Sequence, residues 1–125
     1  MVRLWLLLSS FFGFSAIVLG AFAAHALKKI LTDEQQAIFH TATYYQMIHS
    51  LALFGIALLS LYVPGRIVNI AGLSFLLGII LFSGSLYLLT LTGCSKLGII
   101  TPVGGIAFLV GWFCLGLAAL QLPNL

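Results

Sequence analysis

Residues 38–53 read IFHTATYYQMIHSLAL, a stretch that is apolar enough to enter a membrane and nevertheless contains several polar side chains. Polar side chains in a membrane-spanning helix are costly, and they usually face the interior of a helical bundle. Tyr45, Gln46 and His49 share one helical face, because residues three or four positions apart lie one above the other. His40 is half a turn out of phase with His49 and is expected at the membrane interface. The stretch therefore predicts a spanning helix that directs a polar cluster at its neighbours.

The composition of the whole chain places it in a membrane. Of its 125 residues, 62% are hydrophobic and 6% are charged, whereas soluble domains contain roughly 25% charged residues. The charges leave four uncharged runs, each longer than the roughly 20 residues that cross a hydrocarbon core. We predict an all-α membrane protein, a single domain of four transmembrane helices in an antiparallel bundle with short loops. The spans are expected at about 4–26, 40–62, 67–91 and 102–122.

Charge and cysteine usage argue against several classes of function. The net charge is +3, but the five basic residues are scattered over one terminus and the connecting segments, so contact with lipid headgroups explains them better than nucleic acid. Cys94 and Cys114 lack the spacing of a metal site, and about 18 Å of helix separates them, so we expect two free thiols. We predict no metal, no cofactor and no nucleic-acid partner.

The first span has a second interpretation as a signal peptide, with Arg3 in its charged start and Ala24-His25-Ala26 as a cleavage site. A run of small residues at heptad spacing favours a retained helix, because small residues let helices pack closely. The run comprises Ser9, Gly13, Ala16, Gly20 and Ala23. The fourth span repeats it with Gly104, Ala107, Gly111, Cys114 and Ala118. We predict that the first span is retained and that Gly20 and Gly111 lie at helix–helix contacts.

Local signals predict where the second and fourth helices begin. Thr32 is expected to cap the second helix, with Gln35 as its capping-box partner. Thr101 followed by Pro102 is expected to open the fourth helix, because proline suits the first helical position. In the third span, Leu81 interrupts a stripe of small residues.

Depth along the spans predicts that the polar side chains gather in one leaflet. The polar cluster of the second span lies at a depth similar to that of two serines on the third span. We predict that the cluster faces the bundle interior and meets the third span near these serines, because a buried imidazole needs a partner. His25, at the end of the first span, either closes this layer or reaches water. The candidate layer comprises His25, Tyr45, Gln46, His49, Ser83 and Ser85.

Four segments resemble the signatures of a known family. They read GAFAAHALK at 20–28, TATYYQMIHSLAL at 41–53, FSGSLYLLTLTG at 82–93 and GIITPVGGIAFLVGW at 98–112. In this order they are similar to the domain-of-unknown-function 423 family, which is related to the eukaryotic transmembrane protein 256. The resemblance implies a multi-pass protein of the bacterial inner membrane with no assigned activity. An even number of spans implies that both termini lie on the same side, although three basic residues against two do not orient the chain.

Three functions are weighed from these residues. A non-enzymatic bundle that packs with itself or with a larger membrane complex is preferred, since Ser83 and Ser85 lack the elbow motif and acidic partner of a hydrolase. The alternative is a small oligomeric transporter or channel that uses a polar layer around His49, although the spans contain no carboxylate. A haem- or quinone-binding protein, with His25 and His49 as haem ligands, is less favoured. Trp5 and the four tyrosines are interpreted as an interfacial aromatic belt.

Overall fold

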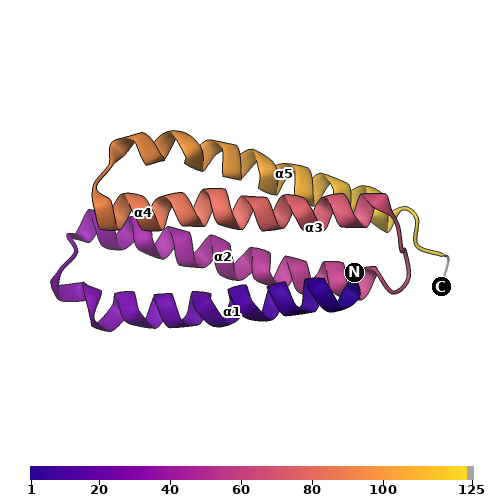
Figure 1. The fold of residues 1–125 in the computed structure, drawn as a ribbon, viewed down its shortest axis with the longest axis horizontal. Helices are drawn as coiled ribbons and strands as arrows, with labels where there is room; N and C mark the ends of the chain where they lie inside the picture. The colour runs from indigo at the N-terminus through magenta and orange to yellow at the C-terminus, as the bar shows by residue number, and fades with distance from the viewer. Residues whose placement is uncertain (124–125) are drawn as a thin grey trace.

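The structure is a computed structural model that describes residues 1–123, and it is a bundle of long helices lying side by side (Figure 1). Four of its helical stretches are long and apolar enough to cross a membrane, which confirms the predicted all-α fold with four helices of membrane length. The third stretch consists of two α-helices joined by a π-helical segment, here called the π segment. The bounds are α1 Val2–His25, α2 Asp33–Leu59, α3 Arg66–Gly78, the π segment Ile79–Ser83, α4 Gly84–Thr92 and α5 Ile100–Ala119. Short 3₁₀ helices, Leu27–Lys29 and Ser95–Ile99, precede α2 and α5.

The helices form two pairs, α1 with α2 and the third span with α5, and α2 connects the pairs. The connection between α1 and α2 lies at one end of the bundle, and the connection between α2 and α3 lies at the other (Figure 1). Helix α1 packs along α2, while α3 and the π segment pack along α5. Helix α2 also contacts α3, the π segment and α4, so it joins the two pairs. The start of α1 and the end of α5 lie at the same end of the bundle (Figure 1).

The predicted capping box at the start of α2 is present. The backbone N–H of Gln35 donates to Thr32 Oγ1 at 3.2 Å, and the Thr32 N–H donates to Gln35 Oε1 at 2.9 Å. The predicted cap of the fourth helix is wrong, because α5 already begins at Ile100 after a 3₁₀ turn. The Thr101 side chain instead contacts Ser85 across the bundle, at 2.6 Å between the hydroxyl oxygens.

The π segment is the feature of the third span that helical periodicity did not predict. It includes Leu81, where the stripe of small residues is interrupted, and it allows α5 to approach the backbone of the third span. A Cβ atom at Gly104 would lie 2.8 Å from the carbonyl carbon of Leu81 and would also overlap the Phe82 nitrogen. An extra residue in one helical turn shifts the side chains that follow onto different faces. The π segment therefore changes which faces of the third span the side chains of α4 occupy.

One of the two glycine predictions is confirmed and the other is wrong. A Cβ atom at Gly111 would lie 2.6 Å from the Phe75 ring, and Gly78 meets the Phe108 ring in the same way, so each helix supplies an aromatic ring to a glycine of the other. Gly20, in contrast, would meet nothing within 4 Å. It borders a hollow between α1 and α2, so the two helices do not meet closely at this position.

The half of the bundle where α1 begins is packed with apolar side chains. Trp5 is 0% exposed and lies against Gly72, where an added Cβ would come within 2.7 Å of the indole ring. Its assignment to an interfacial belt is therefore wrong, because the glycine makes room for the ring in the core. Tyr62 is exposed near the same end. The core here comprises Trp5, Leu53, Ile56, Val68, Ala71, Phe75 and Ala118.

Both cysteines are free thiols, as predicted. Cys94 is exposed in the connection before α5, and Cys114 is buried in the bundle.

Candidate functional site

Polar contacts between helices gather in the other part of the bundle, from its middle to the end where α1 meets α2. Gln46 is the centre of the first cluster and is 3% exposed. Its Nε2 donates to the Phe12 carbonyl at 2.9 Å and to Ser15 Oγ at 2.7 Å, both on α1. Its Oε1 accepts a hydrogen bond of 2.6 Å from the Tyr87 hydroxyl on α4. One amide therefore connects three helices, and both ends of it are hydrogen-bonded within the chain.

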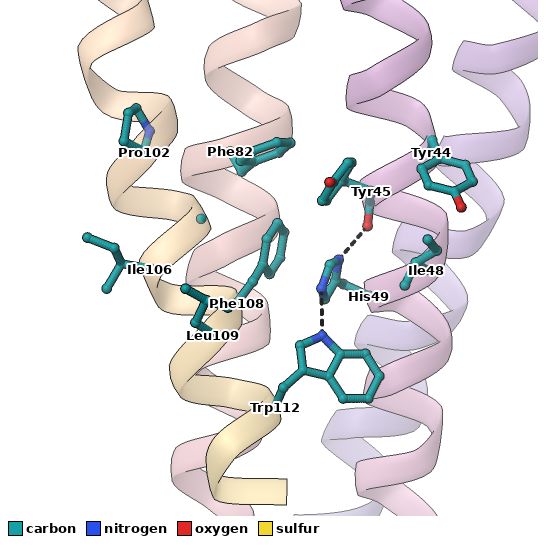
Figure 2. A pocket seen from close by; sticks show the side chains of 11 residues that line it. Tyr44, Tyr45, Ile48, His49, Phe82, Pro102, Ile106, Phe108, Leu109 and Trp112 are labelled. Carbon is teal, nitrogen blue, oxygen red and sulfur yellow. Dashed lines mark hydrogen bonds between the residues drawn. The ribbon is translucent and has the colours of Figure 1, made fainter.

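His49 is the centre of a second cluster, between α2 and α5. Its Nδ1 lies 2.7 Å from the Tyr45 carbonyl, and its Nε2 lies 3.1 Å from Trp112 Nε1 on α5 (Figure 2). A carbonyl only accepts hydrogen bonds and an indole N–H only donates them. His49 is therefore neutral, with its proton on Nδ1 and with Nε2 as the acceptor.

The surroundings of the His49 ring leave no nitrogen free. The ring stacks on Phe108 with centroids 3.5 Å apart and planes 7° apart, and it is 4% exposed. An iron or a transported proton would bind at Nε2 only after Trp112 had moved away. The geometry thus makes His49 a structural residue that connects α2 to α5 through its hydrogen bond with Trp112.

The structure brings the serines of the predicted layer to other partners. Ser83 Oγ donates to the carbonyl of Ala42 at 2.7 Å, one turn before Gln46 on α2. Ser85 faces α5 and not the cluster on α2. Gln46 and Tyr45 do reach the third span near Ser83, as predicted, through Tyr87 and Phe82. His49 does not, since its partner is Trp112 on α5. The two serines are two positions apart, so they point to different sides of their helix and bond to different neighbours.

The two remaining residues of the predicted layer are Tyr45 and His25. The Tyr45 ring lies against Phe82, with centroids 4.5 Å apart, and is partly exposed. His25 is exposed at the end of α1, so it does not close the layer. Among residues 1–123, no group of three His, Cys, Asp or Glu side chains is placed to hold a metal ion.

A hollow of about 690 Å³ lies between α2 and α5, beside the His49 cluster (Figure 2). Phe82 of the π segment contributes to its lining, and the exposed side chains Tyr44, Ile106 and Leu109 border it. It is thus open toward the surface of the spanning helices. The other lining residues are Tyr45, Ile48, His49, Pro102, Gly105, Phe108 and Trp112.

Three partners in these clusters were not predicted from the sequence. Tyr87 was assigned to an interfacial belt, whereas its hydroxyl binds Gln46 inside the bundle. Trp112 and Phe108 are 63 and 59 positions beyond His49 in sequence, on a helix whose packing face was assigned from its small residues alone. Their spacing of four positions, which places two aromatic rings on one helical face, was the available signal.

The hydrogen bond between His49 and Trp112 predicts a measurable coupling energy. His49→Leu leaves the indole N–H without its acceptor, and Trp112→Phe leaves Nε2 without its donor, whereas the double variant removes both groups. We expect the double variant to lose less stability than the two single variants lose together, and the difference should be about 0.5–1.5 kcal/mol. Unfolding of the four proteins in detergent measures this energy. Additive losses would show that the hydrogen bond contributes nothing to stability.

Comparison with known proteins shows the relationship of the whole chain. Residues 19–105 match the family described as "Protein of unknown function (DUF423)". The chain is 40% identical over 121 residues to the UPF0382 membrane protein YwdK of Bacillus subtilis, covering 96% of this chain and 98% of that protein. It is 36% identical over 127 residues to the UPF0382 inner membrane protein YgdD of Escherichia coli, covering 98% of this chain and 93% of that protein. No solved structure matches. The match over most of the chain, together with the four membrane-length helices, shows that this protein belongs to the DUF423 family of membrane proteins.

Proposed function

We propose that the protein is a non-enzymatic component of the bacterial inner (plasma) membrane that packs against a second copy of itself or against a larger membrane complex. The observation that carries this proposal is the use of the polar side chains inside the bundle. Gln46 and His49 are the most polar buried residues of the spans. Both form hydrogen bonds with other helices of the same chain. Such residues hold a scaffold together, and they leave recognition to the surface that faces lipid.

The inner membrane and a common side for both termini belong to the same proposal. A relative in Escherichia coli carries the name inner membrane protein. The start of α1 and the end of α5 lie at the same end of the bundle, which supports placing both termini on one side of the membrane (Figure 1).

The outward face of α1 is the surface that we assign to this association. Helix α1 is the least buried of the four spans and packs mainly along α2. Its exposed side chains include Phe11, Phe14 and Val18, which follow one another at spacings of three and four positions. This is the spacing with which one helix packs along another in a left-handed pair.

Site-specific photo-crosslinking in native membranes tests the proposal. Phe14 on α1 and Phe113 on α5 are 72% and 69% exposed, so they form a matched pair. Each is replaced by cysteine in a chain that carries Cys94→Ser and Cys114→Ala, and is labelled with a benzophenone maleimide. We expect irradiation to link the Phe14→Cys protein to another polypeptide of defined mass, while the Phe113→Cys control reacts with lipid.

Mass spectrometry of the adduct distinguishes a second copy from a different protein. Lipid adducts alone at both positions, together with extraction of a single 13.4 kDa chain in mild detergent, would refute the association.

A further inference from the structure

The hollow between α2 and α5 is positioned to receive a molecule from the bilayer. Its lining runs from Pro102 to Trp112 on α5, a distance of about 15 Å at helical rise. This is half of the roughly 30 Å hydrocarbon core, so the hollow spans about one leaflet. Because exposed side chains of two spans border it, an occupant enters sideways from the lipid (Figure 2).

The lining of the hollow selects an uncharged molecule with a flat ring. None of its lining residues is an acid, a lysine or an arginine, and its volume of about 690 Å³ suits a small molecule. Three of the aromatic rings that line the hollow are exposed, Tyr44 at 55%, Tyr45 at 37% and Trp112 at 47%. An exposed ring offers a flat surface on which another ring stacks, and such a stack is worth more than the area it buries, whereas a flexible acyl chain forms none.

Phenolic hydroxyls supply hydrogen-bond donors at the same place. The Tyr87 hydroxyl is bonded to Gln46, but the hydroxyls of Tyr44 and Tyr45 make no hydrogen bond to any residue from 1 to 123. Both side chains are exposed, at 55% and 37%, so these hydroxyls are free to donate to a ligand that accepts a hydrogen bond. Gly105 keeps this wall open, since the nearest atom to an added Cβ would be Phe82 Cδ2 at 3.9 Å.

We propose that the hollow between α2 and α5 binds a prenylated quinone, an uncharged molecule of the bilayer whose flat ring carries carbonyl oxygens. The quinone ring packs against the aromatic side chains, the Tyr45 hydroxyl donates to one of its carbonyl oxygens, and its tail lies along the exposed rim in one leaflet. This binding is independent of the association through α1, because the two surfaces lie on different helices.

Tryptophan fluorescence provides a direct assay, because a bound quinone quenches a neighbouring indole. The chain has two tryptophans: Trp112 lines the hollow, while Trp5 is buried in the apolar half of the bundle. Trp5→Phe leaves Trp112 as the only reporter, and Trp112→Phe leaves Trp5. Both proteins are titrated with decylubiquinone in nanodiscs of phosphatidylethanolamine and phosphatidylglycerol. We expect saturable quenching of Trp112 and only a weak, non-saturating loss for Trp5; equal, non-saturating quenching of both would overturn the proposal.

Three substitutions in the Trp5→Phe background locate the binding site. Gly105→Leu fills the hollow and should abolish saturable quenching, whereas Gly116→Leu, whose added Cβ would meet no atom within 4 Å, should retain it. Tyr45→Phe removes one donor and should weaken binding by about three- to tenfold. Saturable quenching that persists with Gly105→Leu would overturn the proposal. If Gly105→Leu does not fold, as thermal unfolding will show, Tyr45→Phe decides: unchanged affinity would overturn the proposal, and weakened affinity would support it.

A phospholipid with brominated acyl chains distinguishes an acyl chain from a quinone as the occupant. In nanodiscs made with this lipid, bromine quenches any indole that an acyl chain contacts. We expect decylubiquinone to displace the chain and still give its own saturation curve. If the brominated lipid quenches Trp112 fully and decylubiquinone no longer produces a saturable change, the hollow holds an acyl chain and the proposal is wrong.

Discussion

Replacing Gly104 with alanine is expected to lower the free energy of unfolding by about 3 kcal/mol, near the upper end of the cost of overpacking a protein core. The added methyl group would meet the backbone of the π segment, with the Leu81 carbonyl carbon and Phe82 Cα both 2.8 Å away. A flexible side chain can rotate away from an added methyl group, but a backbone that is already hydrogen-bonded moves only with its whole helix. The third span and α5 would therefore have to separate along their contact.

The adjacent residue provides the control for this substitution. Gly105 belongs to the same helix, and its added Cβ would have Phe82 Cδ2 at 3.9 Å as its nearest neighbour, which is ordinary contact. Gly105→Ala should therefore leave stability unchanged or raise it by up to about 1 kcal/mol through the better helix propensity of alanine. Thermal unfolding of both variants in the same detergent makes the comparison. Equal stabilities would mean that α5 does not approach the π segment as closely as the structure shows.

Gln46→Leu is expected to produce the second largest loss, about 2 kcal/mol, at nearly constant side-chain volume. The substitution removes the bonds to Phe12 and Ser15 on α1 and leaves the Tyr87 hydroxyl on α4 without its acceptor. A buried hydroxyl without a partner adds its own desolvation cost to the lost hydrogen bonds. Because the amide connects three helices, its loss weakens two interfaces at once.

Two further variants separate the contributions of these bonds. Gln36→Leu, which breaks a single bond of 3.3 Å to the Ala23 carbonyl, should cost less than half as much. Tyr87→Phe should cost about 1 kcal/mol, since it removes one bond and leaves Gln46 bound to α1. Denaturation by sodium dodecyl sulfate in mixed micelles ranks the three proteins. A Gln46→Leu protein as stable as the Gln36→Leu protein would show that the cluster holds no helices together.

The helices were predictable because they follow from local properties of the chain. Uncharged runs of sufficient length require spanning helices, and the capping box of Thr32 and Gln35 specifies where α2 begins. Glycine contacts were predictable only where the partner helix presents a large side chain. Gly111 meets Phe75, but the same heptad reasoning failed for Gly20, which borders a hollow between α1 and α2 and meets no side chain.

The polar residues were predictable as a set but not in their pairing. A period of 3.6 residues correctly indicated that Gln46 and His49 lie inside the bundle, yet it placed them on one face with a common partner. In the structure they bond to opposite neighbours, α1 and α4 for Gln46 and α5 for His49. Residues on one helical face can diverge when three helices surround it. The π segment added a second difference, since nothing in local propensity requires an extra residue in that turn.

The position of α2 in the chain has a consequence for how the protein enters the membrane. It is the least apolar of the four spans, and it is made directly after α1. The Phe12 carbonyl and the Ser15 hydroxyl are thus already available when Gln46 leaves the ribosome, so its Nε2 meets acceptors at once, while its Oε1 waits for Tyr87, 41 positions later. His49 waits for Trp112, which is synthesised 63 residues later. The polar groups of α2 are therefore shielded from lipid in the order of synthesis, first by the helix that precedes it and last by the helix that completes the chain.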